Sequence, residues 1–556
     1  MIQFGNGIRS DKTMLYAVLG LTVLANASGL FVTILEPDSA SYASIAKTMV
    51  ERHDFVDLFA MGEDWLDKPH LPFWLSAISF SVFGFSTWAY KLPALLLVLL
   101  SGHYTYLFAR LFYDKHVALV AAIILLSAQH IIISSSDVRA EAYLIAFVIG
   151  SVYHLYQAGR LNSQANLVAG SLLAAAAVMT KGIFALIPIG GSLAGGFLLN
   201  RQWTQIVHVR WLVATLLVFV FISPEIYCLW RQFDSHPEKV VFETTGVSGV
   251  RFFLWDSQFG RFFNTGPIRG RGNPFQYLQV ILWAFLPWSP AFYVAAYDAI
   301  RKTLNQQQRA VEYFNLSGGL LTFLLFSASQ FQLPHYLNIA FPFFAIMTAA
   351  FILNLNTSAA ERLATVWQWL FVTVALTVCL SLQLAFPPES WFGPIVLLVL
   401  AALLLLHLAK RSWHRWQLRM IAVLATGSAA ANLFLNGYLT PELMKYQAGT
   451  EMAAFLNTQY LGQPVSQLGD FYSWSLDFYL KAPVSMIDES MLQKGQLPTG
   501  TLIYGPAHVL NPLIGKVRLI HRAANYPISR LTVGFLNPLT RARNVSETWL
   551  VQIENR

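Results

Sequence analysis

Two carboxylates, Glu36 and Asp38, directly follow a long apolar run that extends from Met14 to Leu35. Roughly 20 apolar residues cross the hydrocarbon core of a bilayer, so both side chains are expected where a first membrane helix emerges from lipid. A carboxylate at that boundary can accept a proton from an acceptor hydroxyl, as a general base. The pair therefore predicts chemistry on a polar group that is carried by a lipid.

Two structural explanations for the same residues stay open. Both carboxylates could be solvated groups at a helix end, and Asp38 could cap the N-terminus of the helix that follows it. That following segment, residues 39–50, has apolar residues at helical spacing. Its pattern predicts an amphipathic helix that lies on the membrane surface.

Other charged side chains interrupt the apolar runs further along the chain. Asp67 and Lys68 precede Pro69, which favours an extended backbone at the lysine. A lysine near a membrane carboxylate is a candidate phosphate ligand, and a surface ion pair is the alternative. Lys181, directly before Gly182, is a second candidate phosphate ligand, or a side chain that reaches lipid headgroups.

A cluster of Asp137, Arg139 and Glu141 stands between two apolar runs. Charges near a membrane are costly and usually face a partner or a water-filled cavity. We therefore assign Asp137 and Arg139 to a substrate cavity, together with Glu36 and Asp67. The alternative is that Arg139 only neutralises the neighbouring carboxylates.

The long loop over residues 231–275 ends in a run rich in Arg and Gly. Guanidinium groups match phosphate geometry, so Arg269 and Arg271 are candidate donor-phosphate ligands, unless the loop binds headgroups. In the segment 330–336, Pro334 breaks the helix and leaves His335 and Tyr336 at the membrane boundary. These two side chains could hydrogen-bond a sugar or serve as interfacial anchors.

Metal-ligating signals are weak. His53 and His70 each stand near an aspartate, but no His, Cys and Asp spacing specifies a metal site. A divalent metal is left open, and no other cofactor is required by the sequence. Cys228 and Cys379 both lie inside apolar runs and are expected to be core packing residues.

Composition determines the class of protein that must position these groups. The chain has 556 residues, of which 55% are hydrophobic and 12% charged, whereas soluble domains carry about 25% charged residues. We therefore predict an all-α polytopic membrane protein. The net charge of +8 arises from basic residues between apolar runs, where they orient spans, so nucleic-acid binding is not expected.

The distribution of Lys and Arg predicts the topology. About fourteen apolar runs are present, and the basic turns fall on one side only if the run from His70 to Phe83 lies at the interface. This gives about thirteen transmembrane helices, with a cytoplasmic N-terminus, an uncleaved first span and the C-terminus on the far side. All the candidate site residues above then face the far side.

Two domains are predicted. Residues 1–440 form the transmembrane domain, with an amphipathic first outer loop over residues 35–90. Residues 441–556 form an extracytoplasmic α/β domain, because strand-like stretches at 501–504 and 517–520 alternate with turn residues and a helical pattern near 451–460.

At these residues the chain resembles the lipid-dependent membrane glycosyltransferases of the GT-C fold, in particular the aminoarabinose transferase-like and protein mannosyltransferase-like members. The resemblance covers the whole chain in layout and a few short motifs in identity. It implies that Asp38 is the catalytic aspartate and that Lys68 contacts the donor phosphate. The positions that match cavity residues of the family are Tyr42, Asp137, Lys181 and Tyr336.

Two positions depart from the family pattern. Ser39 replaces an acidic residue and Ser41 replaces an arginine. An arginine lost from a phosphate site removes a charge-assisted hydrogen bond, worth about 1.5–3 kcal/mol. Lys47, Lys68 or the arginines between residues 261 and 271 could compensate.

The resemblance implies an inverting transfer of a sugar from a polyprenyl-phosphate carrier to an acceptor outside the cytoplasm, at a bacterial inner membrane. The acceptor would be lipid A, another envelope glycolipid or a protein, and membrane lipids would be further partners. A transporter or flippase of a lipid-linked substrate is the alternative. It predicts broken helices with charges near the bilayer midplane and repeat symmetry.

Overall fold

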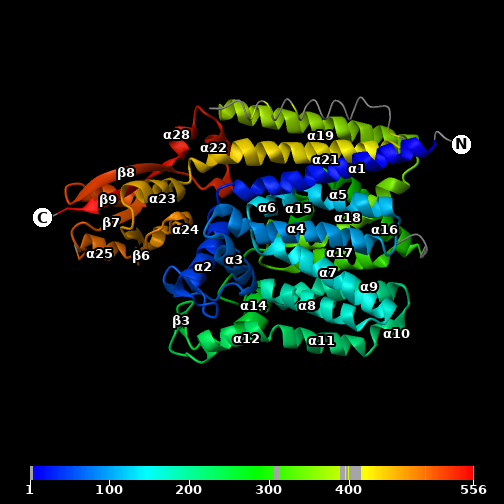
Figure 1. Ribbon diagram of the computed structural model, residues 1–556, viewed down its shortest axis with the longest axis horizontal. Coiled ribbons are helices and arrows are strands. Elements are labelled where there is room, and N and C mark those ends of the chain that lie inside the picture. The colour runs from blue at the N-terminus through cyan, green and yellow to red at the C-terminus, as the bar shows by residue number, and fades with distance from the viewer. Residues whose placement is uncertain are drawn as a thin grey trace.

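A computed structural model describes residues 4–305, 312–387, 415–494 and 496–554, with single positions between 388 and 414. Its long helices run side by side, and the N-terminus lies at one end of the bundle (Figure 1). A sheet region projects from the opposite end. The helices of the bundle are α1 (Phe4–Ala27), α4 (Thr87–Ala109), α5 (Lys115–Ser127), α6 (Gln129–Ser136), α7 (Ala140–Leu161), α8 (Gln164–Lys181), α9 (Leu186–Leu199), α11 (Arg210–Phe221), α15 (Gln276–Ala284), α16 (Ser289–Leu304), α17 (Tyr313–Ala328), α18 (Phe341–Asn354), α19 (Ser358–Ala385) and α21 (Trp416–Phe434).

Six helical stretches in the described part of the chain are long and apolar enough to cross a membrane. Helices α5 and α6 form a further candidate span that is bent by 56°. The chain is therefore a multi-pass membrane protein, as its composition predicts. The number of thirteen spans remains a prediction, and the run that begins near residue 391 lies outside the described residues. The six stretches are Asp11–Phe31, Thr87–Ala109, Trp203–Phe221, Pro334–Asn354, Ser358–Ala385 and Trp416–Met444.

The outer and inner helices differ in where their apolar side chains point. Helices α11 and α19 lie at opposite edges of the bundle in Figure 1. Their large apolar side chains are exposed, for example Leu212 at 61% on α11 and Leu363 at 72% on α19. Apolar surface of this extent must be covered, and in a multi-pass protein lipid covers it. The inner helices α5, α7 and α18 bury their side chains in one continuous core.

Several short elements gather at the end of the bundle that carries the sheet (Figure 1). Helix α3, with 13 residues and Pro72 in its first turn, is among the shorter apolar helices. Helix α2 does not present its apolar face to the membrane as expected. Ala40, Ile45 and Met49 are buried, because α2 packs against α3 and α24. The elements at this end are α2 (Asp38–Arg52), β1 (Phe59–Ala60), β2 (Glu63–Asp64), α3 (Leu71–Phe83), α12 (Ser223–Leu229), β3 (Val240–Val241), β4 (Thr244–Thr245), α13 (Gly249–Arg251), α14 (Ser257–Phe263) and α22 (Thr440–Met444). The short helix α10 (Trp203–Ile206) lies at the other end of the bundle (Figure 1).

The C-terminal region contains the predicted mixture of helices and strands. A five-stranded sheet has the order β6-β5-β7-β9-β8, with β5 parallel to both β6 and β7, and β9 antiparallel to both β7 and β8. The elements are α23 (Ala448–Gln459), β5 (Val465–Leu468), α24 (Trp474–Tyr479), β6 (Val484–Ile487), α25 (Glu489–Gln493), β7 (Leu502–Pro506), α26 (Ala507–Leu510), β8 (Val517–Asn525), α27 (Val533–Leu536), α28 (Arg541–Asn544) and β9 (Ser546–Ile553).

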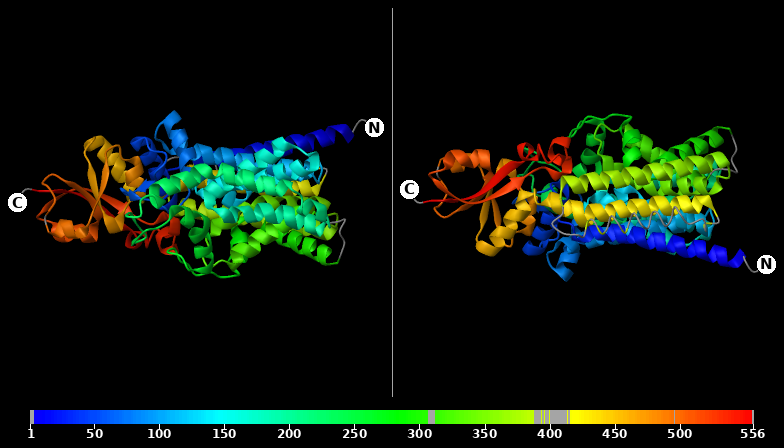
Figure 2. Two further views of the ribbon diagram at one scale, coloured as in Figure 1. Left: turned by 90° about the horizontal axis from the view of Figure 1, so that it is seen from below. Right: turned by 90° about the horizontal axis from the view of Figure 1, so that it is seen from above.

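The sheet region is seated on the ends of α19 and α21, as the right-hand view of Figure 2 shows. Tyr526 and Phe535 stack at 3.8 Å between ring centroids and share an apolar cluster with Phe386. Arg541 donates a hydrogen bond of 2.6 Å to the carbonyl of Ala385 and covers the ring of Phe386. The helical stretch Trp416–Met444 includes residues 440 and 441, where the sequence places the domain boundary, and the division into two domains stays a prediction.

Candidate active site

A cavity of about 290 Å³ opens at the end of the helical bundle that faces the sheet region. It lies among α2, the loop before α3, the start of α7, the end of α8, α14 and the segment 331–336. Polar and aromatic side chains from all of these elements meet there. The lining residues used below are Asp38, Tyr42, Trp65, Asp67, Lys68, Arg139, Glu141, Lys181, Arg261, Phe331, His335, Tyr336 and Trp474.

Asp38 is the first residue of α2, and its side chain pairs with Arg139. The Arg139 Nη1 lies 2.5 Å from Asp38 Oδ2, and its Nη2 lies 2.9 Å from Asp137 Oδ2. The Asp38 side chain is 50% exposed, so it remains open to the cavity. It does not cap α2, whose N-cap residue is Pro37 with no side-chain hydrogen bond. Arg139 thus holds Asp38 at the cavity wall and leaves one face of the carboxylate accessible.

Lys181 ends α8 and forms an ion pair with Glu141, which lies in the first turn of α7. Glu141 is almost fully buried, and the ammonium of Lys181 also sits 3.8 Å above the ring of Tyr336. The chain reverses at Gly182, whose φ of +96° favours glycine. This reversal ends the helix at Lys181 and leaves the ammonium at the cavity.

Asp67 bridges two cations. Lys68 Nζ lies 2.5 Å from Asp67 Oδ2, and Arg261 Nη2 contacts Asp67 Oδ1. Burial opposes the charge on Asp67, but Lys68 and Arg261 outweigh it and hold the pKa of this carboxyl below its usual value. Asp67 therefore fixes Lys68 and Arg261 side by side at the cavity.

These side chains form what we name the charged wall: Asp38, Asp67, Lys68, Arg139, Glu141, Lys181 and Arg261. Each cation has a carboxylate partner, but Lys68 and Arg261 share Asp67, so the four cations exceed the three carboxylates of the wall by one charge. Ammonium and guanidinium groups that are already oriented can bind an anionic oxygen with little rearrangement. The arrangement suits a phosphate that enters between the cations.

The loop that carries Lys68 is fixed by a buried ion pair. His70 and Glu225 are both fully buried, with His70 Nδ1 2.9 Å from Glu225 Oε1. The other ring nitrogen lies 2.8 Å from the carbonyl of Val56. Because both nitrogens face acceptors, the ring carries a proton on each of them. Burial opposes this charge, but Glu225 raises the pKa of His70 above its usual value.

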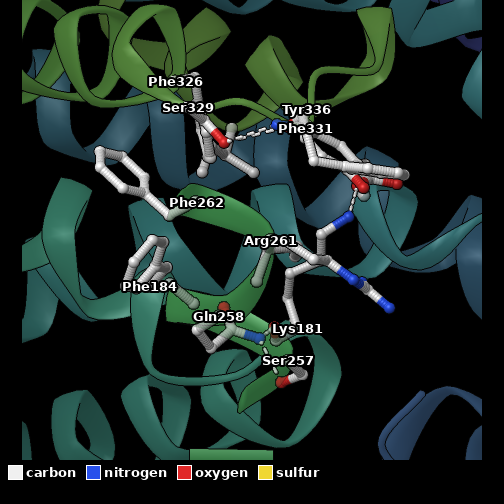
Figure 3. A pocket seen from close by; sticks show the side chains of 14 residues that line it. Lys181, Phe184, Ser257, Gln258, Arg261, Phe262, Phe326, Ser329, Phe331 and Tyr336 are labelled. Atoms are coloured by element: carbon white, nitrogen blue, oxygen red, sulfur yellow. Dashed lines mark hydrogen bonds and ion pairs between the residues drawn. The ribbon is translucent and has the colours of Figure 1, made fainter. Parts of the chain in front are cut away.

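A smaller apolar side pocket of about 50 Å³ adjoins the cavity. In Figure 3, Lys181 and Arg261 lie side by side, and the rings of Phe184, Phe262 and Phe326 occupy the other side of this pocket. The polar groups of the charged wall thus lie directly beside an aromatic recess.

The structure brings together most of the residues selected from the sequence. Those that line the cavity are Asp38, Tyr42, Asp67, Lys68, Arg139, Lys181, His335 and Tyr336. Asp137 lies behind Arg139 rather than on the cavity surface. His335 faces Glu141 at 3.8 Å and Arg139 at 3.5 Å, so it belongs to the same polar group.

Glu36 does not line the cavity, contrary to the prediction. Its Oε1 accepts hydrogen bonds from Ser473 Oγ at 2.7 Å and from the backbone N–H of Ser475 at 2.6 Å. These partners lie more than 430 residues away in the chain. Glu36 therefore binds the sheet region instead of substrate, because the fold places α24 beside the start of α2.

Arg269 and Arg271 are exposed and lie outside the cavity lining, contrary to the prediction. The glycines of this run serve packing: a Cβ on Gly272 would lie 2.3 Å from the carbonyl oxygen of Ser329. The Arg/Gly run is therefore explained by close backbone approach, and Arg261 on α14 is the loop arginine that reaches the cavity.

The weak metal candidates are not supported. Both ring nitrogens of His70 are already engaged, and His53 is exposed at the end of α2. Within the described residues, no group of three or more His, Cys, Asp or Glu side chains is arranged to hold a metal. Lys47 cannot replace the missing arginine at Ser41, because its ammonium is bound to carbonyls of the sheet region. Cys228 and Cys379 are buried and free, as expected.

Several lining residues were not selected from the sequence as site residues, among them Trp65, Glu141, Arg261 and Trp474. Glu141 carries a usable signal, because a carboxylate in the first turn of an apolar helix needs a partner. Arg261 was considered only together with the other arginines of residues 261–271, as a group that could compensate for Ser41. The two tryptophans carry no such signal, since tryptophans are frequent at membrane boundaries.

Comparison with known proteins supports the fold. The family model described as dolichyl-phosphate-mannose-protein mannosyltransferase matches residues 67–228. An undecaprenyl phosphate-alpha-4-amino-4-deoxy-L-arabinose arabinosyl transferase of Pseudomonas aeruginosa is 26% identical over 456 residues, which cover 78% of this chain and 78% of that protein. An uncharacterized protein of Aquifex aeolicus is 25% identical over 372 residues, 66% of this chain and 68% of its own length.

Among solved structures, ArnT from Cupriavidus metallidurans bound to undecaprenyl phosphate superposes with a TM-score of 0.72. The sequence identity is 17%, and the match covers 97% of both chains. This similarity establishes that the two proteins share a fold from end to end, including the sheet region.

Proposed function

We propose that this chain, a membrane glycosyltransferase with the GT-C fold similar to the aminoarabinose transferases, moves a sugar from a polyprenyl-phosphate carrier to an acceptor in the cavity described above. The observation that supports it is the convergence of Asp38 and four cations on one cavity beside an aromatic recess. A lipid-linked sugar phosphate has a phosphate that matches the cations and a prenyl chain that matches the aromatic recess, and its transfer brings an acceptor to Asp38.

The cations would act on the leaving group. The bond between the anomeric carbon of the sugar and the phosphate oxygen breaks, and its electron pair remains on the phosphate. Lys68, Lys181 and Arg261 would stabilise that developing charge, because they are already oriented by Asp67 and Glu141. Preorganised donors need no rearrangement at the moment of reaction, which is the basis of their effect on rate.

Asp38 would act on the acceptor. An acceptor hydroxyl attacks the anomeric carbon from the face opposite to the phosphate, so the configuration is inverted, and its proton passes to the Asp38 carboxylate. Arg139 keeps the carboxylate oriented. If the acceptor is a phosphate, no proton is transferred and Asp38 contributes orientation alone.

The apolar recess would receive the first prenyl units of the carrier. Phe184, Phe262 and Phe326 line it directly beside Lys181 and Arg261 (Figure 3). If the phosphate of the lipid lies at the charged wall, its prenyl chain would therefore run toward the helices. Along that path it would meet aromatic side chains rather than polar backbone groups. This arrangement supports a donor that approaches from the bilayer.

Further properties are part of the same proposal. The cavity would face the periplasmic side of a bacterial inner membrane, in a topology of about thirteen spans. The acceptor would be lipid A, another envelope glycolipid or a protein, and a metal requirement is open. Relatives named for 4-amino-4-deoxy-L-arabinose transfer suggest the first donor to test.

The alternative of a transporter or flippase is not favoured. The charges that line the cavity lie at one end of the bundle, not along a path through it. One broken helix pair, α5 and α6, is present, but its break is at the apolar residue Ala128.

The experiment is transfer of labelled sugar by the purified protein in lipid nanodiscs. The donors are undecaprenyl phosphate carrying 4-amino-4-deoxy-L-arabinose and undecaprenyl phosphate carrying mannose, offered with an envelope lipid and protein extract. We expect one donor to be used, and Asp38→Asn to lower transfer about 10²–10⁴-fold while undecaprenyl phosphate still binds.

Arg269→Gln is the matched control, because this exposed arginine does not reach the cavity. Wild-type rates in Asp38→Asn would remove Asp38 from the mechanism. Absence of transfer from every polyprenyl-phosphate donor, with no binding of undecaprenyl phosphate, would refute the proposed function.

A further inference from the structure

We propose that Trp65 and Trp474 form the surface on which the donor sugar stacks, and that Glu36 is a positioning residue that holds Trp474 at the cavity. This inference rests on the proposed function and extends it to recognition of the sugar. We name these two tryptophans the aromatic wall.

The aromatic wall is built from two distant parts of the chain. Trp65 lies in the loop before α3, two residues before Asp67, and Trp474 begins α24 in the sheet region. Both line the cavity, and their rings meet edge to face with centroids 6.1 Å apart. The sheet region thus completes the cavity that the helical bundle leaves open.

Glu36 holds the residues on both sides of Trp474. Its Oε1 accepts hydrogen bonds from Ser473 Oγ and from the backbone N–H of Ser475, at 2.7 and 2.6 Å. The backbone N–H of Glu36 donates to Gln447 Oε1 at 3.1 Å, which adds a second link to the sheet region. Since Asp38 follows two residues later, one short segment fixes both the carboxylate and the tryptophan.

The other end of α24 is held as firmly. Lys47 of α2 is buried and donates hydrogen bonds to the carbonyls of Asp477, Phe478 and Leu480, at 2.8, 3.2 and 2.8 Å. Ser44 donates to the carboxylate of Asp477. Helix α24 is therefore locked along α2 at both ends, and the indole of Trp474 has little freedom to leave the cavity.

An aromatic surface at this place fits a sugar. A sugar ring presents a face of C–H groups, which packs against the negative face of an indole, and a positively charged amino sugar adds a cation–π attraction. The Trp65 Nε1–H is buried and has no acceptor among the described residues, so the indole meets the cavity through its ring. A phosphate gains nothing from these rings, since all of its ligands lie on the charged wall.

The two walls therefore predict separable effects. Loss of an indole should weaken binding of the sugar-bearing donor and leave binding of undecaprenyl phosphate itself unchanged. We expect Trp474→Leu, which keeps apolar bulk for the fold, to raise KM for the sugar donor roughly fivefold to tenfold. The inhibition constant of undecaprenyl phosphate should stay within twofold of wild type, and Trp474→Phe should recover most of the lost affinity.

Glu36→Gln tests the positioning role. The amide retains the oxygen that accepts from Ser475 but loses the charge, so the same rise in KM is expected in weaker form. When Glu36→Gln is combined with Trp474→Leu, KM should rise little further than in Trp474→Leu alone, because both changes act through the indole of Trp474. Melting temperatures in nanodiscs, measured for every variant, separate this effect from loss of folding.

Two outcomes would overturn the inference while the proposed function stands. One is transfer by Trp474→Leu with wild-type KM. The other is an equal rise in KM of the sugar donor and in the inhibition constant of undecaprenyl phosphate, in either Trp474→Leu or Trp474→Phe. A wild-type protein that neither transfers sugar nor binds undecaprenyl phosphate would refute both.

Discussion

The two walls of the cavity differ in how they are built. The charged wall consists of ion pairs among residues 38–261, all within the helical part of the chain. In the aromatic wall, Trp65 contacts the ring of Trp474 from the sheet region, and the neighbours of Trp474, Ser473 and Ser475, donate hydrogen bonds to Glu36. Charges in this setting must be paired where they stand, whereas an indole needs only a rigid support.

This difference suggests a division of labour. Phosphate recognition is common to every polyprenyl-phosphate donor, so it belongs to the charged wall. Selection of the sugar belongs to the aromatic wall. Changes to the first should affect all donors equally, and changes to the second should depend on the sugar.

The largest effect is expected at the centre of the charged wall. Lys181→Met should lower transfer from every donor by about 10²–10³-fold, as for loss of one transition-state donor. It also leaves the buried Glu141 unpaired, which costs about 3–5 kcal/mol of stability. The measurements are transfer rate and melting temperature in nanodiscs.

A double variant separates these two losses. Lys181→Met with Glu141→Gln should recover much of the melting temperature but none of the transfer. Recovery of transfer in the double variant would contradict a role for Lys181 at the phosphate.

The next effect concerns the shape of the cation. Arg261→Lys keeps the charge but loses the fork that contacts Asp67. We expect binding of undecaprenyl phosphate to weaken about tenfold, or about 1.4 kcal/mol. The change in KM should be the same whichever sugar the donor carries. A change in KM that depended on the sugar would contradict the assignment of phosphate binding to the charged wall and sugar binding to the aromatic wall.

A smaller, pH-dependent effect is expected at His70, which supports the loop of Lys68. Its pKa is raised by Glu225, so its contribution to stability is fully present below about pH 6.5, its unfolded pKa. That contribution is lost as pH rises through the raised value, with a slope of at most about 1.4 kcal/mol per pH unit. The melting temperature of the wild-type protein should therefore fall as the pH rises above the unfolded pKa of His70.

His70→Gln removes the titrating group and should flatten this dependence. The KM for the donor should rise with pH in wild type and stay level in the variant. Parallel pH profiles for the two proteins would show that His70 does not control the loop.

The smallest effect is expected at the exposed arginines. Arg269→Gln and Arg271→Gln should change transfer by less than twofold, because both side chains lie outside the cavity. A loss comparable to that of Arg261→Lys would restore the original assignment of these arginines to the donor phosphate.

The charged wall could be predicted from the sequence to a large extent, because charges are few in an apolar chain and each must have a reason to be there. Asp38, Lys68, Arg139 and Lys181 were selected for this reason, and all line the cavity. The structure brings Arg261 to the cavity and leaves Arg269 and Arg271 outside it, because a high density of arginine in the sequence does not indicate which side chains point inward. The tertiary structure is needed for this, because Gly272 packs directly against the backbone of Ser329 and the arginines beside it point outward.

Glu36 and the aromatic wall mark the limit of that reasoning. Glu36 and Asp38 are equivalent in sequence, as two carboxylates at one helix end. Their roles separate because α24, contributed from more than 430 residues away, supplies hydrogen-bond donors to one of them. No local pattern carries that information.

The sequence by itself determined that this chain crosses a membrane many times and that its ionisable groups gather at the ends of apolar runs. The hydrophobic effect and the cost of charge in lipid act on every residue, so they leave a pattern in composition and spacing. Which charges face the cavity, and which tryptophan completes it, was decided only by the tertiary structure, because these depend on contacts between segments that are remote in the chain.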